Sequence, residues 1–241
     1  MTATGPRKDL AERLREVSRR LSRRFGSPRR SPHLTEPIRN LILTILSQNT
    51  TDANRDRAYA SLARRFPTIP LLAAAPPEDV EEAIRAGGLA RAKAKAILSA
   101  LSRIRKEKGG YTLDFLSEMP LAEARDYLTS FTGVGVKTAN VVLLFSFGKE
   151  AFPVDTHILR VTKRLGLVPV TADLSRAALL IEPHVSPGEP MPLHLNLIRL
   201  GREICRPRNP MCPECPLLAV CPEGKRCVGK QAAGKPGAGP R

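Results

Sequence analysis

A lysine stands at the start of an expected helix, directly after a glycine-rich turn. The segment 132–138 reads TGVGVKT and places Lys137 in the first turn of that helix. An amine attacks only when neutral, and the ordinary lysine pKa of about 10.4 keeps most lysines protonated. A helix N-terminus and partial burial both disfavour the protonated form. Lys137 is therefore a candidate nucleophile, while a surface lysine that contacts phosphate remains the alternative.

The two glycines of this turn, Gly133 and Gly135, let the backbone approach a phosphate closely. Their N–H groups, with the helix start at Val136, would form an anion site. A Gly-x-Gly pair is a weak signal by itself, because two packing glycines in a helical hairpin would look the same. The phosphate-binding P-loop is excluded, since the G-x-x-x-x-G-K spacing is absent.

A carboxylate follows in the segment Val154-Asp155-Thr156-His157. Asp155 comes directly after Pro-Val at the start of an expected helix, where aspartate commonly caps the first turn. A carboxylate can also accept a proton from an amine, and the two roles are compatible. We expect His157 to be a helix residue that meets a polar partner in the core.

Four cysteines near the C-terminus follow the pattern C-x6-C-x2-C-x5-C: Cys205, Cys212, Cys215 and Cys221. Four thiolates can enclose one tetrahedral ion or one cubane cluster. Zinc sites more often use two CxxC pairs, so the spacing favours a cluster but leaves zinc open. Arg206 and Arg208, between the first two cysteines, are expected to contact phosphates. Cys227 lies outside the pattern and is expected to be a free thiol.

Helical periodicity runs through most of the chain, and no convincing strand pattern is found. The apolar run VVLLFSF could be a strand by periodicity alone, but its flanking helices and connection lengths favour a helix. A loop is expected at 27–37, and the Gly/Pro/Lys-rich residues 223–241 are expected to be a disordered basic tail. The expected helices, the hairpin turn included, lie at 8–25, 38–47, 52–66, 78–86, 91–107, 121–129, 133–148, 153–167, 174–183 and 192–204.

Composition indicates a folded basic protein that binds a polyanion. The chain has 241 residues, of which 42% are hydrophobic, and 39 Lys and Arg against 23 Asp and Glu give a formal net charge of +16. Such a charge favours nucleic-acid binding with strong salt dependence, although a basic protein without that role remains possible. No apolar run reaches the ~18 residues of a membrane span, and the arginine-rich N-terminus is unlike a signal peptide. We expect a cytoplasmic, nucleoid-associated protein.

Together these motifs resemble endonuclease III, in the helix-hairpin-helix DNA glycosylase superfamily. The matching segments are LTSFTGVGVKTANVV, PVDTHILRV and CRPRNPMCPECPLLAVC, which occur in the family's order. The similarity runs from about residue 38 to 221. It implies an all-α fold of two lobes. One is a helical barrel at 38–149 that carries the hairpin, and the other joins 1–37 to 150–222 around a [4Fe-4S] cluster held by the four cysteines.

The resemblance also implies an activity. It predicts a bifunctional glycosylase and AP lyase of base excision repair, which removes oxidised pyrimidines from duplex DNA. Lys137 would attack the sugar C1′ and form a Schiff base, with Asp155 as its carboxylate partner. The implied partner is double-stranded DNA with damaged bases or abasic sites, and the protein is expected to be a monomer.

Other positions match the family's DNA contacts less closely. The family's SxQxTD-like segment reads SQNTTD at 47–52, which places Asn49 rather than the adjacent Gln48 at the position that fills the gap left by a flipped base. Leu89 matches an apolar wedge, with an ordinary core leucine as the alternative. Phe131-Thr132 stands where the family usually has Leu-Pro, which is expected to loosen the approach to the hairpin. Gly133, Gly135 and Val136 would contact phosphate.

Two other functions are compatible with parts of the sequence. A mismatch-specific or weakly active glycosylase would share the scaffold, but such relatives usually lack the lysine. A non-catalytic DNA-binding or redox-sensing relative would need neither Lys137 nor Asp155. Covalent trapping on DNA with borohydride distinguishes an amine-based lyase from both.

Overall fold

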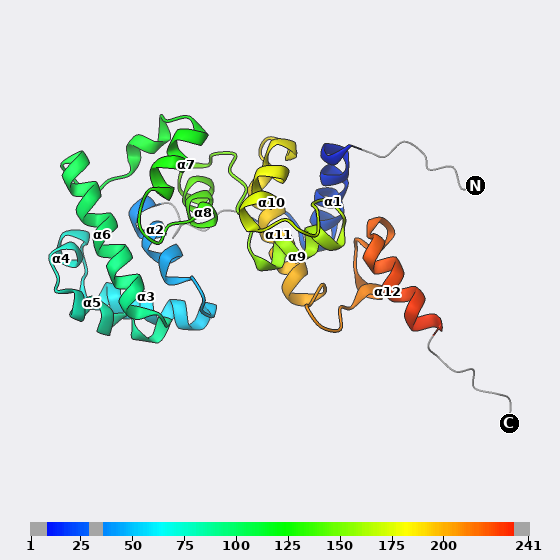
Figure 1. Ribbon diagram of the computed structural model, residues 1–241, viewed down its shortest axis with the longest axis horizontal. Coiled ribbons are helices and arrows are strands. Elements are labelled where there is room, and N and C mark those ends of the chain that lie inside the picture. The colour runs from blue at the N-terminus through cyan, green and yellow to red at the C-terminus, as the bar shows by residue number, and fades with distance from the viewer. Residues whose placement is uncertain (1–8, 29–35, 234–241) are drawn as a thin grey trace, which may run out of the picture. The chain divides into compact units, whose positions relative to one another are not determined.

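The computed structural model describes residues 9–28 and 36–233, and in these residues the protein is all helical (Figure 1). The all-α prediction is therefore confirmed. The α-helices are α1 (Leu10–Phe25), α2 (Pro37–Leu46), α3 (Asp52–Arg65), α4 (Ile69–Ala73), α5 (Pro77–Ala83), α6 (Ala90–Lys108), α7 (Leu121–Thr129), α8 (Val136–Phe147), α9 (Thr156–Arg164), α10 (Leu174–Ile181), α11 (Pro190–Glu203) and α12 (Pro222–Ala233). Short 3-10 turns are η2 (Arg85–Gly87), η3 (Asp114–Ser117), η4 (Glu182–His184), η5 (Cys212–Glu214) and η6 (Leu218–Val220).

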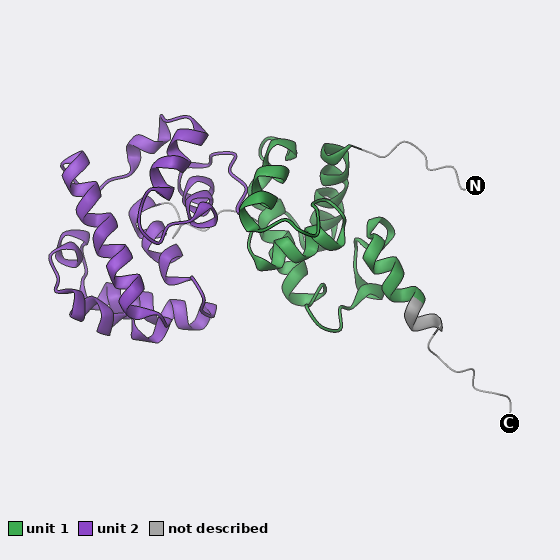
Figure 2. Cartoon of the chain, viewed as in Figure 1, with its two compact units in different colours: residues 1–29, 154–241 green, residues 30–153 purple. Residues whose placement is uncertain are grey.

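The chain divides into two compact units, and one is built from both ends of the chain (Figure 2). Unit 1 comprises residues 1–29 and 154–241, and unit 2 comprises residues 30–153. The boundary between unit 2 and the second part of unit 1 lies after residue 153, whereas the sequence placed it after residue 149. The difference arises because the segment that follows α8 is still part of the core of unit 2. Phe152 is fully buried, and its carbonyl accepts a hydrogen bond from Asn140 of α8 at 3.2 Å.

The core of unit 2 forms around α8. This helix is apolar on nearly all sides, as expected of a helix that is buried on all sides. It packs against α2 and α7, while α5 and α6 pack together. Two buried asparagines fix these contacts: Asn40 donates to Ser146 Oγ at 2.8 Å, and Asn140 accepts from Arg125 Nε at 2.7 Å.

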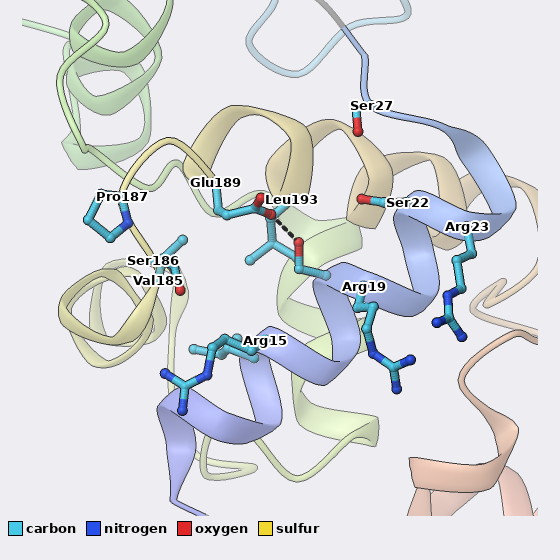
Figure 3. Close-up of a pocket in the computed structure, with 12 residues that line it drawn as sticks. Arg15, Arg19, Ser22, Arg23, Ser27, Val185, Ser186, Pro187, Glu189 and Leu193 are labelled. Carbon is cyan, nitrogen blue, oxygen red and sulfur yellow. Dashed lines mark hydrogen bonds between the residues drawn. The ribbon is translucent and has the colours of Figure 1, made fainter.

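Unit 1 is held together by contacts between α1 and the C-terminal half of the chain. Arg13 donates to the carbonyls of Leu165 and Gly166, at 2.6 and 2.9 Å, at the end of α9. Ser18 donates to the carboxylate of Glu189, beside the start of α11. Figure 3 shows this bond in a cavity of about 680 Å³, whose wall also carries Arg15, Arg19 and Arg23 of α1.

The sequence expectations differ from the structure at the C-terminal end. The irregular tail predicted from residue 223 is wrong for residues 223–233, which belong to α12. Pro222 suits the first position of a helix, and the N–H of Gly224 in the first turn donates to Cys221 Sγ at 3.2 Å. Residues 234–241 and most of the predicted 27–37 loop lie outside the described residues. No described helix is long and apolar enough to cross a membrane.

Candidate functional site

The helical hairpin expected around the glycine pair is formed by α7 and α8. Phe131 and Val134 are buried in its turn, and Val134 N–H donates to the Phe131 carbonyl at 3.1 Å. Phe131 also packs edge-on against Tyr127, and Arg103 lies over its ring while donating to Ser130 Oγ at 2.8 Å. These contacts hold the approach to the turn where the family usually has a proline.

The two glycines of the turn differ in whether the surrounding structure requires a glycine. Gly133 has φ +78°, and a Cβ there would lie 3.0 Å from the Cβ of Ala96, so both conformation and space exclude a side chain. Gly135 has φ −90°, and a Cβ there would meet nothing within 4 Å. The fold itself therefore leaves room for a side chain at 135. Its absence keeps the start of α8 accessible.

The first turn of α8 contains Lys137 and follows the exposed residue Gly135. Gly135 occupies the N-cap position and supplies no side-chain acceptor, and no acidic residue lies in the first turn. The leading N–H groups of a helix have no partner within the helix, and the helix dipole makes this end positive. Lys137, the second residue of α8, is half-buried. Lys137 thus lies at the positive end of the α8 dipole.

The side chain of Gln48 is hydrogen-bonded to this hairpin. Its side-chain Nε2 donates to the carbonyl of Gly133 at 2.9 Å and to Thr138 Oγ1 at 3.2 Å. The next residue, Asn49, is exposed and has φ +50°, a left-handed conformation that side chains other than Asn, Asp and Gly rarely adopt. Gln48 therefore braces the hairpin, and Asn49 presents its side chain to solvent.

Leu89 is not a core leucine. It is 60% exposed and, like Asn49, adopts the left-handed conformation, with φ +51°. Its side chain therefore contributes little to the core, and its backbone conformation is one that leucine rarely adopts. The structure thus excludes the alternative that sequence alone left open at this position.

A buried lysine links the Gln48 and Leu89 segments, and the sequence analysis missed it. Lys93 is 3% exposed, and its Nζ donates to the carbonyls of Leu46 at 2.8 Å and Gly87 at 2.9 Å. Burial lowers the pKa of this amine. Its position in the sequence could have indicated this burial, because Lys93 lies four residues before Ile97, on the apolar face of α6.

Asp155 caps α9 as the sequence predicted. Its Oδ1 accepts the N–H of Ile158 at 2.8 Å, and the residue is half-exposed. His157 meets a polar partner, since its Nδ1 lies 3.2 Å from Arg160 Nη2, but this partner is a partly buried residue of the same helix and not a core residue as expected. The capping bond engages one carboxylate oxygen, so the geometry is compatible with a second role.

The cysteine loop that follows α11 is fixed by two arginines of α9. Arg160 donates to the carbonyls of Gly201 at 2.8 Å and Cys205 at 2.9 Å. Arg164 donates to the carbonyls of Arg206 at 2.8 Å and Pro207 at 3.0 Å, and its Nη1 lies 3.2 Å from Cys205 Sγ. The backbone of the loop is thereby held, while the side chains of Arg206 and Arg208 are exposed.

The four cysteines of the motif line one cavity of about 380 Å³, and Cys227 of α12 lines it as well. Burial raises the pKa of the Cys212 thiol to about 12 and that of Cys215 to about 11. Across the described residues, no three His, Cys, Asp or Glu side chains converge closely enough to hold one metal ion. The cysteines that line this cavity are the residues that could hold a metal ion or a cluster.

Comparison with known proteins agrees with this arrangement. The profile of the HhH-GPD superfamily of base excision DNA repair proteins matches residues 42–182. Endonuclease III of Thermotoga maritima is 38% identical over 211 residues, which cover 86% of this chain and 92% of that protein. Endonuclease III of Bacillus subtilis is 34% identical over 192 residues, which cover 80% of this chain and 84% of that protein.

Solved structures give the same result. A trapped endonuclease III–DNA covalent intermediate superposes with a TM-score of 0.76 at 32% identity, covering 90% of this chain and 98% of that one. A thermostable thymine-DNA glycosylase superposes with a TM-score of 0.75 at 25% identity, covering 91% and 100%. The sequence motifs, the hairpin and the comparisons agree, and this chain belongs to the endonuclease III family within the HhH-GPD superfamily of base excision DNA repair proteins.

Proposed function

We propose that this protein is a bifunctional DNA glycosylase and AP lyase of base excision repair, and that it removes oxidised pyrimidines from duplex DNA. The observation that carries the proposal is the place of Lys137 in the first turn of α8. That turn has no side-chain cap, and its N–H donors are accessible past Gly135. A related enzyme of the same fold has been trapped as a covalent intermediate with DNA, which supports an amine nucleophile.

The chemistry follows from the lysine. The neutral Lys137 amine attacks the sugar C1′, so that a nitrogen–carbon bond forms while the bond to the damaged base breaks. We assign Asp155 the role of accepting the amine proton or stabilising positive charge on the sugar. The sugar ring then opens as the C1′–O4′ bond breaks and O4′ takes up a proton. The Schiff base that results acidifies the C2′ proton. Its loss breaks the C3′–oxygen bond and nicks the strand on the 3′ side of the lesion.

Binding of the DNA is assigned to the backbone of the hairpin and to two exposed side chains. Gly133, Gly135 and Val136 would hold a phosphate at the start of α8. A damaged nucleotide must leave the base stack, at a cost of a few kcal/mol. Asn49 would fill the gap that it leaves, and Leu89 would wedge between neighbouring bases. The exposed left-handed conformations of both residues support these roles.

The cofactor that fits the cysteine cavity is a [4Fe-4S] cluster. Cys205, Cys212, Cys215 and Cys221 would hold it. When bound, such a cluster crosslinks the loop after α11 to the start of α12 through its thiolates. Arg206 and Arg208, on the loop that the cluster and Arg164 hold, would contact DNA phosphates.

A second candidate is removal of a mismatched base without strand cleavage. The structural similarity to a thymine-DNA glycosylase favours it. Lys137 favours the lyase, because release of a base requires no amine whereas Schiff-base chemistry does.

Borohydride trapping tests the proposed function. The cluster-loaded protein is incubated with a duplex that contains one abasic site and is then reduced, with the Lys137→Gln variant in parallel. We expect a covalent protein–DNA adduct with the wild type only, while both proteins bind the duplex. Absence of an adduct from a wild-type protein that binds the duplex would exclude the lysine lyase and favour the mismatch glycosylase.

A further inference from the structure

A fifth thiol lies at the proposed cluster site. Cys227 falls outside the C-x6-C-x2-C-x5-C pattern, yet its side chain lines the same cavity as the four cysteines of that pattern. Soft thiolates are the preferred ligands of iron–sulfur clusters. The cavity therefore offers one ligand more than a four-cysteine cluster uses.

The start of α12 fixes Cys227 beside this cavity. Gly224 N–H donates to Cys221 Sγ at 3.2 Å, and a Cβ at Gly224 would lie 3.2 Å from Leu218 Cδ1 and 3.4 Å from Cys221 Sγ. The glycine thus allows the helix to approach the thiols closely. Cys227 follows Gly224 by three residues, so both lie on one face of α12. The helix also packs against η5, which contains Cys212.

Cys227 and Cys212 belong to two elements that pack together. Cys227 lies in α12, and Cys212 begins η5, against which α12 packs. Both side chains line the same cavity, whereas Cys215 and Cys221 lie outside these two elements. Any exchange of ligands is therefore expected at the Cys212 position.

We propose that Cys227 is a reserve ligand, which can replace Cys212 on one iron of the cluster. The inference rests on the proposed [4Fe-4S] cofactor. The exchange is a ligand substitution without a change of oxidation state. The Cys227 thiol loses its proton to solvent as its sulfur–iron bond forms, and Cys212 takes up a proton as its own sulfur–iron bond breaks. The packing of α12 against η5 brings the incoming and the outgoing sulfur to the same cavity.

Iron content and visible absorbance of purified variants test this ligand exchange. Four proteins are compared: wild type, Cys212→Ala, the double variant Cys212→Ala/Cys227→Ala, and Cys215→Ala as the matched control. We expect Cys212→Ala to keep an iron content and an iron–sulfur absorbance close to the wild type. The double variant should lose both, and so should Cys215→Ala, which has no reserve thiol beside it.

Loss of iron from Cys212→Ala to the same extent as from the double variant would overturn the reserve-ligand proposal. A wild-type protein that binds no iron would instead overturn the proposed cofactor, so the two failures are distinguishable. Alkylation provides a second readout in the folded, loaded proteins. Cys227 should react with iodoacetamide in the wild type and be protected in Cys212→Ala, and equal reactivity in the two would contradict the exchange.

A third measurement does not depend on the stability of the Cys212 variants. Iron release to a chelator is followed in the loaded wild type and in Cys227→Ala. Without the reserve thiol, an iron that has lost Cys212 is not recaptured, so we expect release about tenfold faster, the lower range for residues that support metal ligands. An unchanged release rate would contradict the proposal.

Discussion

The starts of α8 and α9 are built in opposite ways. At α8 the N-cap is Gly135, which has no side-chain acceptor, and the first turn carries Lys137. At α9 the N-cap is Asp155, whose carboxylate accepts the N–H of Ile158 at 2.8 Å. The first helix has no side-chain acceptor at its N-cap for its leading N–H donors, and the second satisfies one of its donors with its own N-cap side chain.

The two helix starts also differ in what stabilises them. A capped helix gains stability, typically about 1 kcal/mol, from its own side chain. The uncapped start of α8 forgoes that contribution and depends on neighbours. Gln48 holds the carbonyl of Gly133 and the hydroxyl of Thr138. The start of α8 is therefore held by a side chain from another segment rather than by its own N-cap residue.

The largest expected effect comes from Lys137→Arg. Arginine keeps the positive charge but stays protonated and cannot act as the nucleophile. We expect nicking of abasic DNA to fall by about 10³-fold or more, with the DNA dissociation constant nearly unchanged. Lys106→Arg, exposed on α6, is the control and should nick normally. A Lys137→Arg protein that nicks at the wild-type rate would show that Lys137 only contacts phosphate.

Asp155→Asn removes the negative charge at the start of α9 but keeps a side chain that can cap the helix. Asparagine caps a helix about as well as aspartate, so stability should be retained, while base release should slow by about 100-fold if the carboxylate accepts a proton. Asp173→Asn is the matched control, because Asp173 caps α10 in the same way, through the N–H of Arg176 at 2.7 Å. Equal rates of base release from the two variants, measured in single turnovers, would reduce Asp155 to a capping residue.

Lys93→Met tests the buried amine that links the Gln48 and Leu89 segments. Loss of the buried amine leaves the carbonyls of Leu46 and Gly87 without their donor. We expect the free energy of unfolding to fall by about 2 kcal/mol or more, since each unsatisfied buried acceptor costs about 1–3 kcal/mol. Lys95→Met, exposed two residues along the same helix, should change it by less than about 0.5 kcal/mol. Similar denaturation midpoints for both variants would contradict this linking role.

The same lysine gives a pH dependence. Because burial lowers its pKa below the ordinary 10.5, the unfolded chain binds this proton more tightly than the folded protein does. Stability should therefore rise with pH between the lowered pKa and 10.5, and the charged form should cost stability below that window. The difference in free energy of unfolding between wild type and Lys93→Met, measured across this range, should follow that rise. A difference independent of pH would show that the pKa is not lowered.

The smallest expected effect distinguishes the two glycines. Gly135→Ala meets no atom within 4 Å in the protein, so stability should be nearly unchanged, while its methyl group would obstruct a phosphate at the start of α8. We expect the dissociation constant for DNA to rise about tenfold, the equivalent of one hydrogen bond to a charged group. Gly133→Ala should instead lower stability by about 1 kcal/mol or more, because of its φ of +78° and the nearby Ala96. Unchanged DNA binding by Gly135→Ala would argue against a phosphate at this helix start.

The local features of the fold were predicted well from the sequence. Apolar periodicity identified the helices from α1 to α11 apart from the five-residue α4, and the aspartate after Pro-Val correctly marked the start of α9. These signals are local, since capping and helical periodicity depend on residues within one or two turns. The helix α12 was missed because its glycines and lysines do not form an apolar stripe, and its first turn is set by a contact with Cys221.

The sequence by itself determined the chemistry available to the protein: an amine after a glycine turn, a carboxylate at a helix start, and a cluster of thiols. Only the tertiary structure decided which glycine is required by backbone conformation, that Lys93 is buried between two loops, that Leu89 is exposed, and that Cys227 lines the cavity of the other four cysteines. These outcomes depend on neighbours from distant elements, such as Ala96 against Gly133 or Leu46 against Lys93. Residue type and local spacing cannot specify such contacts, because they form only when the helices pack.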